Sequence, residues 1–278
     1  MPLPASFAEL QENEAVMLYL PRLEWRAEHS LTRLREVGFR NVALEAGVDS
    51  ALEDARAAAL VDGWRFDPGI TPGEIGFSTS MLRIWQRVVD EDLAYLLVFE
   101  DDVLPHPDID RVGQTYWDET PSDADFVFLG SRMDRTDLAR LPGRVVALPT
   151  WCTHAYVVTQ RGAAEGLERL RDQITRADRW PRVLDQELRR WMEDGLVRYA
   201  CWNGSLLPPA FPRSDQVLGG GVLPTDVAWV DRDTGPFFQN FSLVSRDPAP
   251  PKGRAVLITP VAPTLRGDAF ADRALVVL

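Results

Sequence analysis

The sequence places three consecutive carboxylates, Glu100 to Asp102, directly after its most continuous apolar run, which covers residues 93–99. A run of Leu, Tyr, Val and Phe without alternation is typical of a strand that is buried on both faces of a parallel sheet. Acids crowded at the end of such a strand repel one another unless a cation or open solvent relieves the charge, and open α/β sheets bind ligands at the carboxyl ends of their strands. The pattern therefore indicates a divalent-metal site at Glu100, Asp101 and Asp102.

An acidic turn in open water is the alternative interpretation of the same three residues. Short acidic patterns are common, and two aspartates one residue apart occur again at 123–125 and at 231–233. Only the triplet at 100–102 follows a predicted buried strand, which would hold the acids in place. The residues alone leave the metal site and the solvated turn both open.

Two further aspartates occupy positions from which a carboxylate could act on a ligand. Asp49 follows a predicted strand at 41–44 and could contact a ribose hydroxyl, although Asp49 or Ser50 could instead cap the alanine-rich helix that comes next. Asp185 lies at the start of a predicted helix at 184–194. There it could act as a helix cap with a favourable charge–dipole contact, or it could accept a proton from a substrate.

Strands and helices alternate along the chain as far as about residue 201, which predicts an α/β fold. The clearest signal precedes the acidic strand, where Thr71 and Glu74 have the spacing of a capping box and Pro72 occupies the first turn. The predicted strands cover residues 15–20, 41–44, 93–99, 126–130, 145–148, 152–159 and 196–201. The predicted helices cover residues 24–37, an alanine-rich segment up to 60, 71–89, 108–117, 161–174 and 184–194.

The composition limits the classes of partner. The chain has 278 residues and a formal net charge of −12, which speaks against nucleic-acid binding through a basic surface and against docking on an anionic membrane. No apolar run approaches the ~20 residues of a membrane span, and residues 1–14 lack the cationic start and apolar centre of a secretory signal. The two cysteines cannot form a disulfide framework, so we expect a reduced, cytoplasmic protein.

The amino-acid composition of the chain changes near Gln216. Three consecutive glycines at 219–221 and scattered prolines follow, with only short apolar runs. We expect a first domain at residues 1–215 and a C-terminal extension at 216–278, to which the sequence assigns no role.

In the order and spacing of its motifs, the chain resembles glycosyltransferase family 25, which includes lipooligosaccharide and collagen galactosyltransferases. The likeness spans about residues 15–212 and is more specific than any single motif. The segments that carry it are Leu18–Leu20 with Arg26 and Asp49, Thr71–Gly76 continuing to Trp85, Val98–Val103, Ala155–Val158 with Gly162–Ala163, and Val183–Leu188 around Asp185.

The resemblance implies a GT-A fold, with a mixed, mainly parallel sheet flanked by helices. It also implies inverting, single-displacement transfer of a hexose from a nucleotide sugar, with UDP as the expected nucleotide, to an acceptor hydroxyl on a glycan or other acceptor, as in lipopolysaccharide biosynthesis. Mn²⁺ or Mg²⁺ is the expected cofactor, because hard oxygen ligands suit these ions and a bound cation neutralises a departing diphosphate.

Residue roles follow from the same resemblance. Asp102 is expected to be the principal metal ligand, assisted by Asp101 and, more weakly, by His154; a lone histidine inside a strand is more often a satisfied core residue. Asp185 is the expected general base, with Glu187 in reserve. The expected donor-binding residues are Asp49, Arg26, Glu74, Glu100 and Asp101; for Arg26, an exposed helix arginine is the simpler alternative.

The chain departs from the family pattern in the helix after the Gly-Glu-Ile-Gly segment. Phe77 and Met81 occupy the positions of the usual cysteine and histidine, and Leu184 interrupts the usual Pro-Val-Asp before Asp185. A glycosyltransferase fold kept as a binding or scaffold module is therefore an alternative. A nucleotidyltransferase is a third, although the sequence lacks the glycine-rich phosphate loop with lysine or arginine that this class normally needs.

Overall fold

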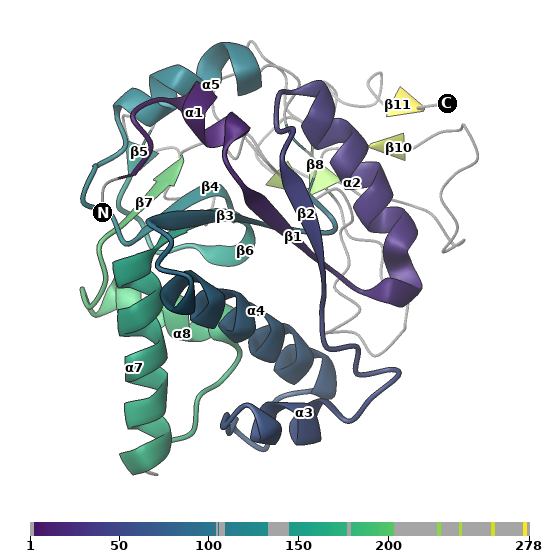
Figure 1. The fold of residues 1–278 in the computed structure, drawn as a ribbon, viewed down its shortest axis with the longest axis vertical. Helices are drawn as coiled ribbons and strands as arrows, with labels where there is room; N and C mark the ends of the chain where they lie inside the picture. The colour runs from purple at the N-terminus through teal and green to yellow at the C-terminus, as the bar shows by residue number, and fades with distance from the viewer. Residues whose placement is uncertain are drawn as a thin grey trace, which may run out of the picture.

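The computed structural model describes residues 3–103, 105, 109–132, 145–176 and 179–202, and four short strands beyond them (Figure 1). The predicted domain boundary at 215/216 lies outside the described residues, as does most of the predicted extension. A seven-stranded sheet with helices on both faces forms the main unit.

The main sheet contains all the strands predicted up to residue 201. Its strands are β1 (Ala15–Tyr19), β2 (Val42–Ala46), β3 (Tyr95–Glu100), β4 (Phe126–Arg132), β5 (Val145–Val146), β6 (Trp151–Thr159) and β7 (Tyr199–Trp202). The short strands β8 (Val227–Ala228) and β9 (Gln239–Asn240) form one antiparallel pair, and β10 (Leu257–Ile258) and β11 (Leu275–Val276) form another.

The helices also follow the sequence prediction, with two short additions near the start of the chain. They are α1 (Phe7–Glu12), η1 (Pro21–Leu23), α2 (Glu24–Glu36), α3 (Ala55–Val61), α4 (Pro72–Asp90), α5 (Ile109–Asp118), α7 (Gln160–Arg176) and α8 (Leu184–Glu193). The sequence analysis did not predict α1 or η1, which are too short for a periodic apolar pattern.

The strand order is β2-β1-β3-β6-β4-β7-β5. The pairs β1–β2, β1–β3 and β4–β7 are parallel, while β6 runs antiparallel to both of its neighbours and β5 runs antiparallel to β7. Five of the seven strands therefore point the same way. The predicted mixed, mainly parallel sheet flanked by helices is confirmed.

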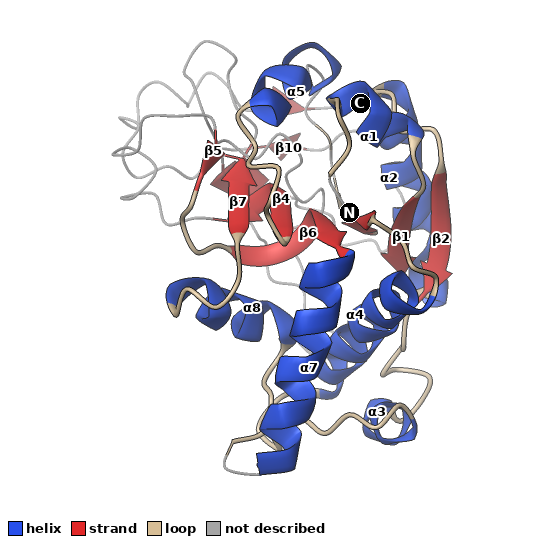
Figure 2. Ribbon diagram, turned by 60° about the vertical axis from the view of Figure 1, so that its left-hand side comes forward, coloured by secondary structure: helices blue, strands red, loops and turns tan. Residues whose placement is uncertain are grey.

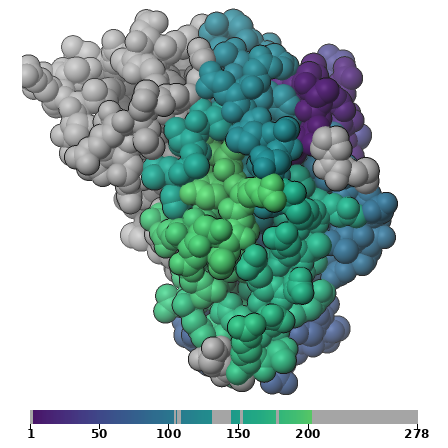
Figure 3. Space-filling model, turned by 90° about the vertical axis from the view of Figure 1, so that its left-hand side faces the viewer, coloured from purple at the N-terminus to yellow at the C-terminus, as the bar shows by residue number. Residues whose placement is uncertain are grey.

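Each face of the sheet has its own apolar core. Leu96 and Val98 of β3 pack on the side of α4, α7 and α8, whereas Leu97 and Phe99 pack on the side of α1, α2 and α5 (Figures 1 and 2). This explains why the run before the acids shows no alternation: both of its faces are buried. Segments from the second half of the described chain, including α7 and α8, form much of the surface in Figure 3.

Helix α4 begins as predicted and packs closely on the loop after β2. The Thr71 hydroxyl accepts from the Glu74 amide, and the Glu74 carboxylate accepts from the Thr71 amide at 2.7 Å, which completes the capping box. A side chain at Gly76 would place its Cβ 2.5 Å from the Val48 carbonyl oxygen. Glycine therefore lets α4 approach the segment that leads to Asp49.

Two capping predictions are wrong. Helix α3 is capped by Asp54, whose carboxylate accepts from the amides of Arg56 and Ala57, and not by Asp49 or Ser50. In α8 the N-cap position belongs to Val183, without a side-chain cap, and Asp185 is the second residue of the helix. Neither Asp49 nor Asp185 is an N-cap residue.

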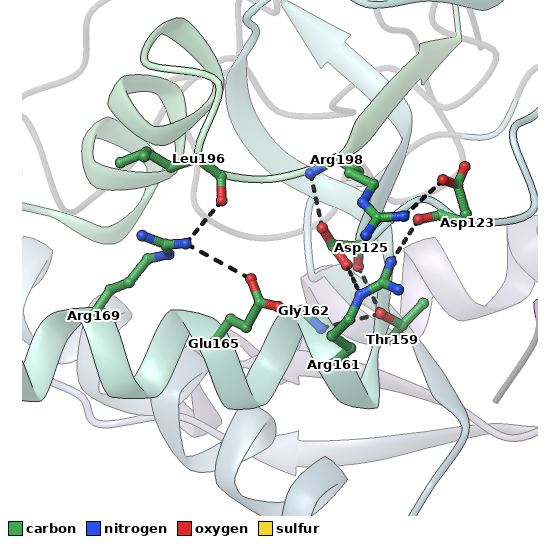
Figure 4. Close-up of polar contacts among 9 residues, drawn as sticks. All are labelled: Asp123, Asp125, Thr159, Arg161, Gly162, Glu165, Arg169, Leu196 and Arg198. Carbon is green, nitrogen blue, oxygen red and sulfur yellow. Dashed lines mark hydrogen bonds and ion pairs between the residues drawn. The ribbon is translucent and has the colours of Figure 1, made fainter.

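The acidic pattern at 123–125 has a structural role at the other end of the sheet (Figure 4). Asp125 is 3% exposed, and its carboxylate accepts from the Arg161 guanidinium and, at 2.8 Å, from the Arg198 amide. Asp123 accepts from the Arg198 guanidinium at 2.8 Å. These bonds join the starts of β4, α7 and β7, so this pattern is a structural ion-pair cluster.

No helix in the described ranges is long and apolar enough to cross a bilayer.

Candidate active site

A pocket opens at the carboxyl ends of the three adjacent parallel strands β2, β1 and β3. One wall comes from the end of β1 and the loop after β2, another from the first turns of α4, and its floor contains the acids that end β3. Ligands of open α/β sheets bind in this kind of location. The residues used below that line it are Arg22, Arg26, Val48, Ser80, Glu100, Asp101 and Asp102.

The acidic triplet forms a tight turn, in which the Val103 amide donates to the Glu100 carbonyl at 3.2 Å. Asp101 is 7% exposed and Asp102 is 8% exposed. The alternative of an acidic turn in open water is therefore wrong. Buried carboxylates need a counter-charge or hydrogen-bond donors, and the surroundings of this turn supply both.

Arg26 provides the counter-charge. Its Nη2 lies 2.8 Å from Asp101 Oδ1 and 3.1 Å from Asp102 Oδ2, and the residue is only 7% exposed. The alternative of an exposed helix arginine is therefore wrong. One turn further along α2, the Ser30 hydroxyl donates to the Asp101 carbonyl at 2.9 Å, so this helix face holds both the side chains and the backbone of the turn.

Glu100 has different partners. Its Oε1 accepts from the Thr153 hydroxyl at 2.8 Å. Burial of the carboxyl group and the charge of Asp102 raise the pKa of Glu100 to about 8, although the Thr153 hydrogen bond opposes this shift. Thr153 was missed in the sequence because its role depends on the antiparallel pairing of β6 with β3.

Asp49 is buried, at 3% exposure, and forms an ion pair with Arg22, whose Nε lies 2.7 Å from Asp49 Oδ2. Its other oxygen accepts from the Ala51 amide at 3.0 Å. The carboxylate thus holds Arg22 at the pocket edge, and its contact with a ribose stays a prediction. The side chain of Arg22, which no sequence pattern marked, is one-third exposed at this edge.

Ser80 of α4 fixes the same wall of the pocket. Its hydroxyl accepts from the Val48 amide at 2.8 Å and donates to the Gly76 carbonyl at 2.7 Å. Both bonds are buried, so the residue before Asp49 is tied to α4. No pattern in the sequence marks this serine, because its partner lies 32 residues earlier in the chain.

Asp185 lies close enough to this end of the sheet to act electrostatically on Glu100. Burial of its carboxyl group and, to a lesser extent, the charge of Glu74 raise the pKa of Asp185 to about 6, against the opposing effect of nearby backbone amides. The start of α8 is anchored to α4 through the Leu184 amide, which donates to the Ser78 hydroxyl at 3.0 Å. The structure therefore places Asp185 near two other acids, a setting typical of functional carboxylates.

Glu187 and Glu74 both have structural partners. Glu187 is 1% exposed, accepts from the Arg182 amide at 2.9 Å and pairs with Arg190 at 2.5 Å. These contacts favour Asp185 over Glu187 as the residue that acts on a substrate. The Glu74 carboxylate serves the α4 capping box, and its contact with a donor stays a prediction.

His154 is 2% exposed within β6, next to Ala155, which pairs with Phe99 of β3. In the described part of the chain, no three His, Cys, Asp or Glu side chains are grouped as a metal would require. The donor set of the turn nevertheless suits a hard divalent cation, because Asp101 and Asp102 offer carboxylate oxygens from one rigid turn. The Arg26 guanidinium, which already bridges these two carboxylates, shows that the turn accepts positive charge.

Comparison with known proteins finds a family match over part of the chain. Residues 48–142 match the family model described as glycosyltransferase family 25 (LPS biosynthesis protein). Over this stretch the chain is similar to glycosyltransferase family 25. The matched region includes Asp49, α4 and the acidic turn, while Arg26 and Asp185 lie outside it.

Individual family 25 relatives match a longer stretch. Inactive glycosyltransferase 25 family member 3 of Homo sapiens is 29% identical over 167 residues, which cover 54% of this chain and 28% of the relative. Procollagen galactosyltransferase 1 of Danio rerio is 28% identical over 178 residues, which cover 58% of this chain and 29% of the relative. The chain thus spans less than a third of the length of these relatives.

Among solved structures, mouse xyloside xylosyltransferase 1 in its apo form matches with a TM-score of 0.36 and 11% sequence identity. The match covers 67% of this chain and 83% of the mouse chain.

Proposed function

We propose that the protein is a metal-dependent, inverting glycosyltransferase that moves a hexose from a nucleotide sugar, UDP-linked, to an acceptor hydroxyl on a glycan or other biosynthetic acceptor. The observation that carries the proposal is the buried turn of Asp101 and Asp102, which lies in a pocket at the ends of three parallel strands. The match to family 25 covers this turn. From the description of that family we infer an enzyme of lipopolysaccharide biosynthesis.

On the donor side, Asp102 and Asp101 would hold Mn²⁺ or Mg²⁺. The ion would act as a Lewis acid that neutralises charge on the departing nucleoside diphosphate. Arg22, which Asp49 holds at the pocket edge, presents a planar guanidinium that suits phosphate oxygens. Glu100, fixed by Thr153, lines the same pocket and can orient the donor sugar nucleotide.

On the acceptor side, Asp185 is the proposed general base. With a pKa of about 6 it is ionised at neutral pH, yet it is more basic than an ordinary aspartate. A base must remove the proton from the attacking hydroxyl as the bond between sugar and phosphate breaks. The helix position of Asp185 and the tie between Leu184 and Ser78 keep this carboxylate in a fixed place.

The experiment that tests the proposal combines binding and turnover. Thermal shift with nucleotide sugars, with and without Mn²⁺, should reveal a donor that raises the melting temperature only when the metal is present, because a ligand of the native state stabilises it. The same donor should be hydrolysed slowly by the wild type. In Asp102→Asn, both the metal-dependent shift and the hydrolysis should disappear, and their persistence would remove Asp102 from the metal site.

A catalytically altered binding module is the second candidate. Three observations favour it: the Homo sapiens relative is named inactive, Arg26 already bridges Asp101 and Asp102, and Met81 is fully buried against the Tyr156 hydroxyl. Met81 therefore contributes to the core where the family usually has a histidine. Donor binding without hydrolysis or transfer would support the module.

A further inference from the structure

We propose that Arg26 sets the affinity of the acidic turn for its cation. In this view the guanidinium neutralises Asp101 and Asp102 in the absence of metal, and a divalent cation must displace it to bind both carboxylates. The inference rests on the proposed function, since it assumes that the turn binds a divalent cation.

The geometry shows why the two positive groups compete. A single nitrogen of Arg26 lies within 2.8 Å of Asp101 and 3.1 Å of Asp102, so it occupies the point where the two carboxylates converge. All three residues are less than one-tenth exposed. A cation that takes Asp101 Oδ1 and Asp102 Oδ2 as ligands would need the same point.

Electrostatic repulsion then prevents the Arg26 guanidinium and a divalent cation from sharing this point. Where water is largely excluded, repulsion between a guanidinium and a divalent cation a few ångströms apart far exceeds thermal energy. Two buried carboxylates without any counter-charge are equally unfavourable. Arg26 therefore preserves the turn in the metal-free protein and, for the same reason, weakens metal binding.

Displacement of the side chain does not require movement of the helix. The Ser30 hydroxyl, four residues after Arg26 on α2, donates to the backbone carbonyl of Asp101 at 2.9 Å. This bond holds the turn on α2 whether or not the guanidinium is in place. Arg26 also lines the pocket, so its guanidinium borders open space into which it could turn.

The test is the affinity for Mn²⁺ alone, measured by isothermal titration calorimetry on the wild type and on Arg26→Met, which keeps an unbranched side chain without the charge. We expect the variant to bind Mn²⁺ about tenfold more tightly. We also expect its metal-free melting temperature to fall by about 5 °C or more, because two buried carboxylates lose the guanidinium that they share. Saturating Mn²⁺ should raise the melting temperature more in the variant than in the wild type.

Arg22→Met is the matched control. Arg22 lines the same pocket and carries the same charge, but the ion pair that it forms is with Asp49. Its removal should change the Mn²⁺ affinity by less than about threefold. Arg26→Lys keeps the competing charge and should bind Mn²⁺ as the wild type does. If Arg26→Met does not fold, Arg26→Gln takes its place with the same expectation.

Three results would overturn the inference. Unchanged or weaker Mn²⁺ binding by Arg26→Met, with normal binding by the wild type, would mean that Arg26 supports the ion, and the proposed function would stand. An equal increase in Mn²⁺ affinity in Arg22→Met and Arg26→Met would mean that the effect comes from the change in net charge alone. No Mn²⁺ binding by the wild type or any variant would remove the metal-dependent function as well.

Discussion

The Thr153 hydroxyl donates a 2.8 Å hydrogen bond to the Glu100 carboxylate, and so joins the antiparallel strand β6 to the acidic end of β3. Thr153 is 2% exposed, so this hydroxyl lies inside the protein. The carboxylate that begins the acidic turn is therefore positioned by a strand that runs in the opposite direction to its neighbours.

Replacement of Thr153 by valine tests this contact, since valine keeps the shape of the side chain and removes the hydroxyl. We expect a loss of about 1–3 kcal/mol in the free energy of unfolding, because a buried acceptor loses its partner, together with weaker donor binding. Urea unfolding and donor titration measure the two effects. Thr159→Val is the control, since Thr159 bonds to Asp125 and Gly162 away from the pocket and should affect stability alone.

Replacement of Asp185 by asparagine tests the general base. The change removes the basic oxygen with little change in volume, so transfer should fall by about 10²–10⁴-fold while donor affinity is kept. Steady-state transfer rates and donor titration measure both quantities. Glu187→Gln should reduce stability more than transfer, because Glu187 forms an ion pair with Arg190 and accepts from the Arg182 amide. A loss of donor affinity in Asp185→Asn would instead assign Asp185 to the donor side.

The same Asp185→Asn variant should be more stable than the wild type at alkaline pH. Burial raises the pKa of Asp185 to about 6, whereas an unfolded aspartate has a pKa of 3.8. Between these values the native state binds more protons than the unfolded state, so the free energy of unfolding falls as pH rises from about 4 to 6 and stays lower above that range. The shift corresponds to about 3 kcal/mol.

Chemical unfolding of the wild type and the variant at pH 4 and pH 8 measures this difference. Asparagine carries no charge at either pH, so we expect a gain of about 2 kcal/mol at pH 8 and little change at pH 4. Equal stability of the two proteins at pH 8 would show that the native Asp185 carboxylate is not destabilised by burial. A gain in stability with a loss of transfer is the pattern expected of a catalytic residue.

Substitution of Gly76 by alanine should disturb the pocket from a distance. The added Cβ would lie 2.5 Å from the Val48 carbonyl, so the loop that carries Asp49 must move away from α4. We expect a loss of about 1–3 kcal/mol in stability and weaker donor binding. Gly162→Ala is the control: its Cβ would meet the Asp125 carbonyl at the same distance, 2.5 Å, far from the pocket. Equal effects of both variants on donor binding would exclude a local role for Gly76.

Much of the fold could be predicted because its signals are local. The capping box of Thr71 and Glu74 and the unbroken apolar run of β3 each depend on neighbours within a few residues, and both are confirmed. The N-caps of α3 and α8 were predicted wrongly. Several polar residues near a helix start can act as the N-cap, and only the backbone geometry decides which residue occupies that position. The acidic turn was located correctly, but its burial was left open.

The partners within the site could not be predicted, since they come from distant parts of the chain. Arg26 meets a turn 75 residues later, and nothing in the spacing of α2 shows which of its faces lies against β3. Thr153 and Ser80 reach the pocket through strand pairing and helix packing, which a linear pattern does not encode. Contacts of this kind depend on the three-dimensional arrangement of segments that are each predictable alone.

The position of β2 at the edge of the sheet gives the pocket walls unequal rigidity. β3 is held on both sides, by β1 and β6, whereas among the described strands β2 pairs only with β1. The wall after β2, which contains Gly47 and Val48, is therefore attached to the sheet through a single ladder and to α4 through Ser80. Amide hydrogens of β2 should therefore exchange with solvent faster than those of β3, and we expect this wall to open more readily than the wall formed by the end of β3.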